Sequence, residues 1–237
     1  MTIMEEVKEL KERKRQLVER REKMTRGSLI TKPLYSIKEE DVLTLDISLD
    51  NIIRRLSYIE SQATVESLPL RWREADFDKS IHGWDVAKRF AENFPNDGKG
   101  VMFLGGVGRG KTHLAGAIAK YVIENHHVPV MFKSYATLLD DIRRNYDEDK
   151  KEIERVCNIP LLVIDDLGQE KQTEWKAETT FKIINSRYET LSPVVITSNC
   201  TVMELRDNVG EAVFSRLFEM CDRVKMSGND FRMEVKE

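Results

Sequence analysis

The chain has 237 residues, of which 41% are hydrophobic and 33% are charged, so it is long enough for one sizeable domain with an appendage. No apolar run approaches the ~20 residues that a membrane-spanning helix needs, and the mixed-charge N-terminus does not resemble a secretory signal. We therefore expect a cytoplasmic protein. A formal net charge of −3 excludes a surface that attracts nucleic acid everywhere, so DNA binding would need a local basic groove.

Two helical segments are predicted before the main domain. In residues 3–24, apolar residues recur at steps of three and four, with interruptions, and residues 1–30 hold nine Lys/Arg against six Glu. A second helix is predicted from about Ser48 to residues 67–69, and residues 70–77 read as a linker. The two helices either pair as a hairpin or dock on a partner. We favour docking, because the narrow apolar stripe of the first helix buries too little surface for that helix to be stable alone.

Strands and helices alternate through the rest of the chain. The expected strands are residues 100–104, 128–133, 161–165, 194–198 and 223–226, and the expected helices are residues 85–93, 111–125, 138–144, 174–191 and 211–220. This alternation predicts a parallel α/β sheet flanked by helices, with ligands at the carboxyl ends of its strands.

The strongest motif is the G-x-x-x-x-G-K-T string from Gly105 to Thr112, placed directly between an apolar strand and a helix. Its glycines allow backbone N–H groups to surround a phosphate, and the helix N-terminus adds its dipole. Lys111 is expected to reach the β- and γ-phosphates of ATP, and Thr112 the Mg²⁺ ion. The expected ATP-binding residues are Gly105, Gly106, Val107, Gly108, Arg109, Gly110, Lys111, Thr112 and His113.

A second motif is the apolar strand of residues 161–165, which ends in Asp165 and Asp166. Asp165 is expected to hold Mg²⁺ through water, and Asp166 to polarise the attacking water. Because Asp166 is one methylene shorter than the usual glutamate, hydrolysis is expected to be slow, or Glu170 assists. The alternative is a pair of solvated aspartates at a strand end.

Two further residues are candidates for ATP hydrolysis. Asn199 follows an apolar strand and would reach between the γ-phosphate and the water, although a Ser-Asn pair also simply ends strands. Arg216 lies in a largely apolar helix and is a candidate arginine finger, which would stabilise charge on a neighbouring subunit's ATP. The alternative for Arg216 is a surface salt bridge.

Taken in order, the strings GKTHLA (110–115), LVIDDLG (162–168), ITSN (196–199) and FSRL (214–217) resemble the DnaC family of helicase loaders, within the AAA+ ATPases. The resemblance covers roughly residues 68–232. It implies a P-loop AAA+ core without a C-terminal helical lid at residues 68–237, preceded by a small helical helicase-interaction region and linker at residues 1–67. Since no cysteine precedes Cys157 and no Cys-x-x-Cys pair occurs, we expect neither zinc nor disulfides.

The resemblance also implies partners. The chain would load a DnaB-type replicative helicase, gripped by the N-terminal region, onto single-stranded DNA, and would self-associate through the AAA+ domain with Arg216 as the finger. Arg232 would be a second sensor, and hydrolysis would be stimulated by DNA or partner. Lys133, Arg143 and Arg144, at the insertion of residues 134–157, would meet DNA phosphates, unless the two arginines are simply solvated.

Three other functions remain open. An IstB-type transposition ATPase would share the core but bind duplex DNA and a transposase. A small-molecule kinase would also carry a P-loop, but no arginine-rich lid or acceptor pocket is recognisable in the sequence. An adaptor that uses ATP as a switch, with little hydrolysis, is kept open by Asp166.

Overall fold

The computed structural model describes residues 3–27, 47–49, 51–52, 65–144, 149–228 and 230–231. The chain divides into two compact units, Met1–Gln62 and Ala63–Glu237. Arg232, the predicted second sensor, lies outside the described residues. None of the helices in the described ranges is both long and apolar enough to cross a membrane.

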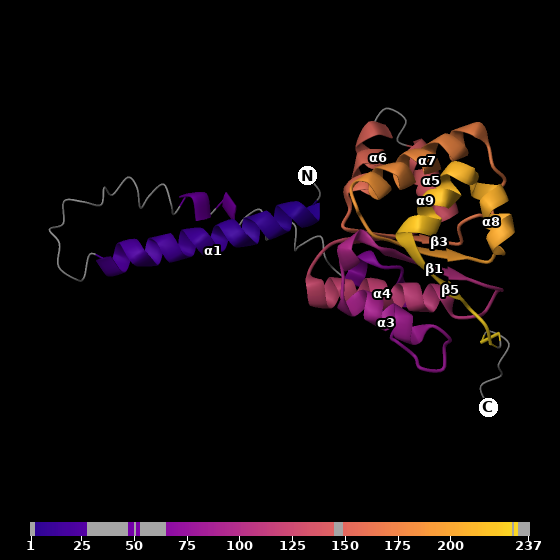
Figure 1. The fold of residues 1–237 in the computed structure, drawn as a ribbon, viewed down its shortest axis with the longest axis horizontal. Coiled ribbons are helices and arrows are strands. Elements are labelled where there is room, and N and C mark those ends of the chain that lie inside the picture. The colour runs from indigo at the N-terminus through magenta and orange to yellow at the C-terminus, as the bar shows by residue number, and fades with distance from the viewer. Residues whose placement is uncertain are drawn as a thin grey trace. The chain divides into compact units, whose positions relative to one another are not determined.

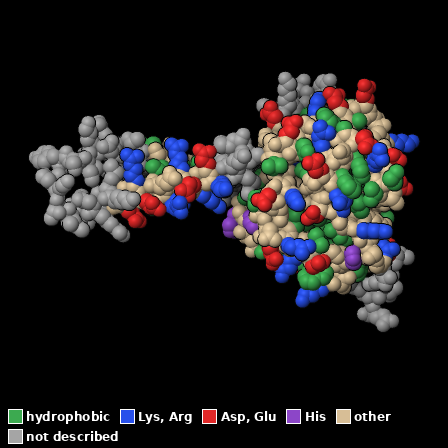
Figure 2. Space-filling view, in the orientation of Figure 1, with side chains coloured by type: hydrophobic (Ala, Val, Ile, Leu, Met, Phe, Trp, Pro, Cys, Tyr) green, Lys and Arg blue, Asp and Glu red, His purple; other side chains and the backbone are tan. Residues whose placement is uncertain are grey.

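The first unit contains α1, a helix of 25 residues from Ile3 to Gly27. Its many Glu, Lys, Arg and Leu residues are strong helix formers, and Arg15 pairs with Glu12 at 2.8 Å. Figure 2 shows acidic and basic side chains on the described middle part of this helix. The predicted helix of residues 3–24 is present, and it extends to Gly27. Of the second predicted helix only residues 47–49 and 51–52 are described, and these are helical.

The second unit is built on a five-stranded parallel sheet in the order β2-β3-β4-β1-β5. The strands are β1 (Gly100–Leu104), β2 (Val130–Ser134), β3 (Leu161–Asp165), β4 (Val194–Ser198) and β5 (Cys221–Lys225). Every residue of β1 and β4 is buried, as expected for central strands covered on both faces. The sheet confirms the predicted parallel α/β architecture.

Helices cover both faces of the sheet (Figure 1). On one face lie α3 (Trp84–Glu92) and α4 (Lys111–His126). On the other lie α5 (Tyr135–Arg144), α6 (Asp149–Asn158), α7 (Glu174–Glu189), α8 (Val202–Val209) and α9 (Glu211–Met220). Short 3-10 turns occur at Val65–Ser67, Leu70–Trp72 and Asn96–Gly98. The core under α5 to α9 is made of alternate residues of β1, β3 and β4, such as Met102, Leu162 and Ile196.

Several elements differ from the prediction. β2 runs from Val130 to Ser134 rather than over residues 128–133, and α5 begins at Tyr135 rather than at residue 138. The last strand begins at Cys221 rather than residue 223, because it is an edge strand whose exposed Asp222 and Arg223 break the apolar pattern. The short helix α8 was not predicted. Its signal was present in the sequence, since Thr201 and Glu204 form a capping box at its N-terminus.

A buried arginine ties α6 and α7 to the sheet. The side chain of Arg187, near the end of α7, is completely buried and donates five hydrogen bonds to backbone carbonyls. The acceptors are Val156, Cys157, Ile159, Pro160 and Pro193. Burial lowers the pKa of Arg187 to about 9, which leaves the guanidinium charged at neutral pH. Arg187 thus satisfies carbonyls at the end of α6 and just before β3 and β4.

Candidate active site

The G-x-x-x-x-G-K-T loop connects β1 to α4. Gly110 caps the N-terminus of α4 in a left-handed conformation, with φ of 81°. A Cβ atom there would lie 2.7 Å from Cγ2 of Ile81, so both the backbone angle and the close packing require glycine. The loop therefore leaves the first N–H groups of α4 at the carboxyl edge of the sheet, where a helix N-terminus binds anions.

Lys111, the first residue of α4, points back into this loop. Only 4% of the residue is exposed, and its ammonium group donates to the carbonyls of Gly105 at 2.7 Å and Gly106 at 2.6 Å. A buried cation held by carbonyl dipoles is a strong attractor for a phosphate anion. The loop is thus already folded around the lysine that sequence analysis predicted to bind ATP.

Asp165 ends β3 next to the loop and is partly buried. Burial raises the pKa of its carboxyl, while hydrogen bonds from Thr197 and Thr112 and the charge of Lys111 oppose that rise. The Thr197 hydroxyl donates to Asp165 Oδ1 at 2.6 Å. Asp165, Thr112 and Lys111 therefore meet in one place, as expected for residues at the carboxyl ends of parallel strands.

Asp166 follows with a left-handed backbone, φ of 57°, which is strained for a non-glycine residue. Its carboxylate accepts hydrogen bonds from Asn199 Nδ2 at 3.0 Å and Gln169 Nε2 at 3.2 Å. The two residues predicted to handle the attacking water are thus in direct contact. Gln169 was not predicted, and nothing in its sequence surroundings distinguishes it.

These residues fit a magnesium ion that binds together with ATP. Among the described residues, no group of three or more His, Cys, Asp or Glu side chains could hold a metal. Mg²⁺ does not need such a cage, because it takes one or two protein oxygens together with waters and substrate phosphates. The Thr112 hydroxyl and the Asp165 carboxylate, which hydrogen-bond to each other, would supply those oxygens.

Other predicted residues are placed on the rim or away from this centre. The His113 ring contacts the backbone carbonyl of Asp76 at 2.9 Å, and Val107 is 52% exposed at the tip of the loop. The Glu170 carboxylate forms an ion pair with Lys176 at 2.9 Å. An assisting role for Glu170 would require that pair to open.

Arg216 lies on α9 and contacts α7 of its own chain. Its guanidinium donates to Asn185 Oδ1 at 2.8 Å and to the Ala212 carbonyl at 2.9 Å, and lies over the rings of Phe181 and Tyr188 at 4.9 Å and 5.7 Å. These contacts orient the arginine, and within the described part of the chain it forms no ion pair with a carboxylate. A guanidinium held in this way keeps its charge available for a neighbouring molecule.

The three predicted DNA-binding residues lie in β2 and at the end of α5. Lys133 pairs with Asp141 at 3.1 Å, the Arg143 guanidinium lies 5.8 Å from the Trp175 ring centroid, and Arg144 is exposed at the end of α5. Lys133 would have to exchange Asp141 for a phosphate. Arg143 and Arg144 remain candidates for a DNA contact.

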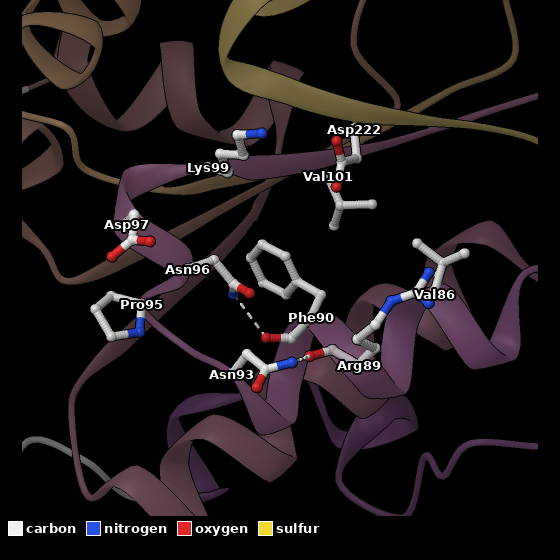
Figure 3. Close-up of a pocket in the computed structure, with 10 residues that line it drawn as sticks. All are labelled: Val86, Arg89, Phe90, Asn93, Pro95, Asn96, Asp97, Lys99, Val101 and Asp222. Atoms are coloured by element: carbon white, nitrogen blue, oxygen red, sulfur yellow. Dashed lines mark hydrogen bonds between the residues drawn. The ribbon is translucent and has the colours of Figure 1, made fainter.

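A cavity of about 510 Å³ lies at the opposite edge of the sheet (Figure 3). It is formed by α3, the 3-10 turn Asn96–Gly98 and the first residues of β1 and β5, and its charged lining residues are Arg89, Asp97, Lys99 and Asp222. Asn96 closes one wall by donating to the Phe90 carbonyl at 2.7 Å. None of the predicted site residues lines this cavity. The predicted ATP-binding loop and the two aspartates that follow β3 lie instead at the carboxyl edge of the sheet.

The fold and this constellation define a P-loop nucleotide-binding protein. The chain matches the family of IstB-like ATP binding proteins over residues 17–237 and belongs to that family. The structure is similar to the crystal structure of the DnaC helicase loader, with 31% identity and a TM-score of 0.62, covering 67% of this chain and 100% of that one. These matches confirm the predicted AAA+ fold and the DnaC/IstB-type family.

Curated relatives include replicative helicase loaders named DnaC and insertion-sequence ATP-binding proteins. An insertion sequence IS5376 putative ATP-binding protein from Geobacillus stearothermophilus is 26% identical over 225 residues, which is 85% of this chain and 88% of that protein. The uncharacterized protein YqaM of Bacillus subtilis is 33% identical over 126 residues, which is 51% of this chain and 40% of YqaM. The chain spans about half the length, or less, of the first curated relatives that it matches.

Proposed function

We propose that this protein is an ATP-hydrolysing helicase loader that places a replicative helicase on single-stranded DNA. The observation that carries the ATPase part is the meeting of Lys111, Asp165 and Asp166 at one edge of the sheet. The loader part is supported by the 31% identity to the solved chain of the DnaC helicase loader, all of which is covered.

The chemistry follows from the residues at this edge. The γ-phosphate of ATP would lie among the N–H groups of the loop, with Lys111 leaving its carbonyl partners to bind phosphate oxygens. Thr112 and Asp165 would hold a Mg²⁺ ion, which would neutralise phosphate charge. Asp166 and Asn199 would orient a water for attack on the γ-phosphorus; the bond to the β–γ bridging oxygen then breaks, giving ADP and phosphate.

Helicase docking is assigned to α1. Among the side chains described in α1, Leu10 and Leu17 are half-buried apolar residues and Val18 is 38% exposed, and charged residues lie beside them in the sequence. An amphipathic helix with a narrow apolar stripe suits a groove on a partner protein. Self-association through the ATPase unit would bring Arg216 to a neighbouring ATP, and Lys133, Arg143 and Arg144 would contact DNA.

A transposition ATPase is the second candidate, because the relatedness to the insertion-sequence ATP-binding protein extends over 85% of this chain, including part of the first unit. In that case the polynucleotide would be duplex DNA and the partner a transposase. The ATP chemistry would be unchanged.

The native mass of the full-length protein, mixed with the replicative helicase of its host and ATP, separates these functions. We expect a complex with the wild-type chain and a weakened complex with the Leu10→Ser, Leu17→Ser double variant. We also expect the wild-type chain to hydrolyse ATP and the Lys111→Ala variant to lose this activity. A substitution that changes the charge of Glu22, in the same helix, is the matched control for the two leucine substitutions and should leave the complex intact. No complex at any nucleotide state would contradict the loader function and favour the transposition ATPase.

A further inference from the structure

Thr197 is a buried polar residue behind the two carboxylates. It is the fourth residue of β4 and is completely inaccessible to solvent. Its hydroxyl donates to Asp165 Oδ1 at 2.6 Å and accepts a hydrogen bond from the backbone N–H of Asp166 at 2.9 Å. One side chain therefore touches both residues that are proposed to handle the metal and the water.

The direction of these two hydrogen bonds is determined by chemistry. The backbone N–H of Asp166 can only donate, so the hydroxyl must accept from it. The single hydroxyl proton is then left for Asp165, whose carboxylate can only accept when ionised. This arrangement occupies Oδ1 and selects one orientation of the Asp165 carboxylate. It also holds the strained backbone of Asp166, which has a positive φ.

Neighbouring contacts fasten the same loop to β4 and α8. The N–H of Leu167 donates to the Thr197 carbonyl at 2.9 Å, the Ser198 hydroxyl donates to the Leu167 carbonyl at 2.6 Å, and Asn208 donates to the Gly168 carbonyl at 2.7 Å. These three contacts hold the backbone beyond the carboxylates. The Thr197 hydroxyl joins the Asp165 side chain to the Asp166 backbone.

We propose that Thr197 is a positioning residue for ATP hydrolysis, acting through Asp165 and Asp166 without touching ATP. This inference rests on the proposed ATPase function. Partners that orient a metal-binding carboxylate typically change activity or metal affinity by about 10–100-fold when they are removed. Loss of the hydroxyl should therefore lower turnover and Mg²⁺ affinity while leaving nucleotide affinity, which depends on the loop around Lys111, nearly unchanged.

The test compares Thr197→Val with Thr197→Ser, which restores the hydroxyl. We expect Thr197→Val to lower kcat about 10–100-fold and to raise the half-saturating Mg²⁺ concentration, with KM for ATP within about 3-fold of wild type. Thr197→Ser should return kcat to within about 3-fold. Should the Val variant melt below the assay temperature, Thr197→Ala removes the same hydroxyl without adding a methyl group.

Thr180→Val is the matched control. Thr180 is also buried, and its hydroxyl bonds to the Tyr135 hydroxyl and the Lys176 carbonyl, both at 2.7 Å, away from the carboxylates. It should lower the melting temperature but keep kcat within about 2-fold. A Thr197→Val enzyme as active as wild type overturns the role of Thr197, as does a Ser variant as slow as the Val variant. A wild-type protein that does not hydrolyse ATP overturns the proposed function itself.

Discussion

Replacement of Arg187 by methionine tests how the second unit is held together. Methionine fills a similar volume but removes five hydrogen bonds and leaves their buried carbonyl acceptors without a donor. Hydrogen bonds to a charged group contribute about 1.5–3 kcal/mol each, or roughly 7–15 kcal/mol for five. Desolvation of the guanidinium offsets several kcal/mol of this.

The expected net loss is about 3–5 kcal/mol, the range typical for removing one partner of a buried charged network. This is a large part of the 5–15 kcal/mol that stabilises an average domain. Urea unfolding followed by tryptophan fluorescence measures it, since all three tryptophans, Trp72, Trp84 and Trp175, lie in this unit. Arg155→Met, at an exposed ion pair with Glu152, is the control and should change stability by less than about 0.5 kcal/mol. A loss below about 1 kcal/mol for Arg187→Met would show that the carbonyls find other donors.

Three further predictions concern the site. Asp165→Asn should raise the thermal unfolding midpoint at pH 7 while abolishing hydrolysis. Burial raises the pKa of Asp165, so the stability that this carboxyl contributes is present below its unfolded pKa and is lost as pH rises through its folded pKa. In thermal melts, the difference between the variant and wild type should therefore vanish near pH 3. Gly168→Ala should cost about 1–3 kcal/mol in urea unfolding, because φ is +91° and the new Cβ would lie 2.8 Å from Leu205 Cδ1; an unchanged midpoint would contradict this. Arg216→Ala should keep ATP binding but lower kcat about 10³-fold, and mixing it with the inactive Lys111→Ala chain should restore part of the activity; if mixing restores none, Arg216 does not act on a neighbouring subunit's ATP.

Local sequence patterns were sufficient for most of the fold and for the ATP-binding loop. The strands at residues 100–104, 161–165 and 194–198 were predicted with their exact bounds, because each is a short apolar run bounded by polar or turn residues. The loop from Gly105 to Thr112 was recognisable for a similar reason, since its residues are consecutive and its glycines are required by local backbone geometry. The sequence also predicted that Asp166 and Asn199 would share one edge of the sheet, which follows from parallel strands.

Only the tertiary structure revealed the buried polar contacts of Thr197 and Arg187. Thr197 meets Asp165 and Asp166 across 31 or 32 positions of sequence, and Arg187 meets the end of α6 across about 30. A threonine in a strand and an arginine in a helix are each ordinary in their local context. Their roles depend on which strand lies next to which and on burial that excludes water, so that every polar group must find a partner within the protein. By itself, the sequence predicted the residues that would contact ATP; the packing of β3 against β4 placed Thr197 beside the two aspartates, and the packing of α7 against α6 placed Arg187 among backbone carbonyls.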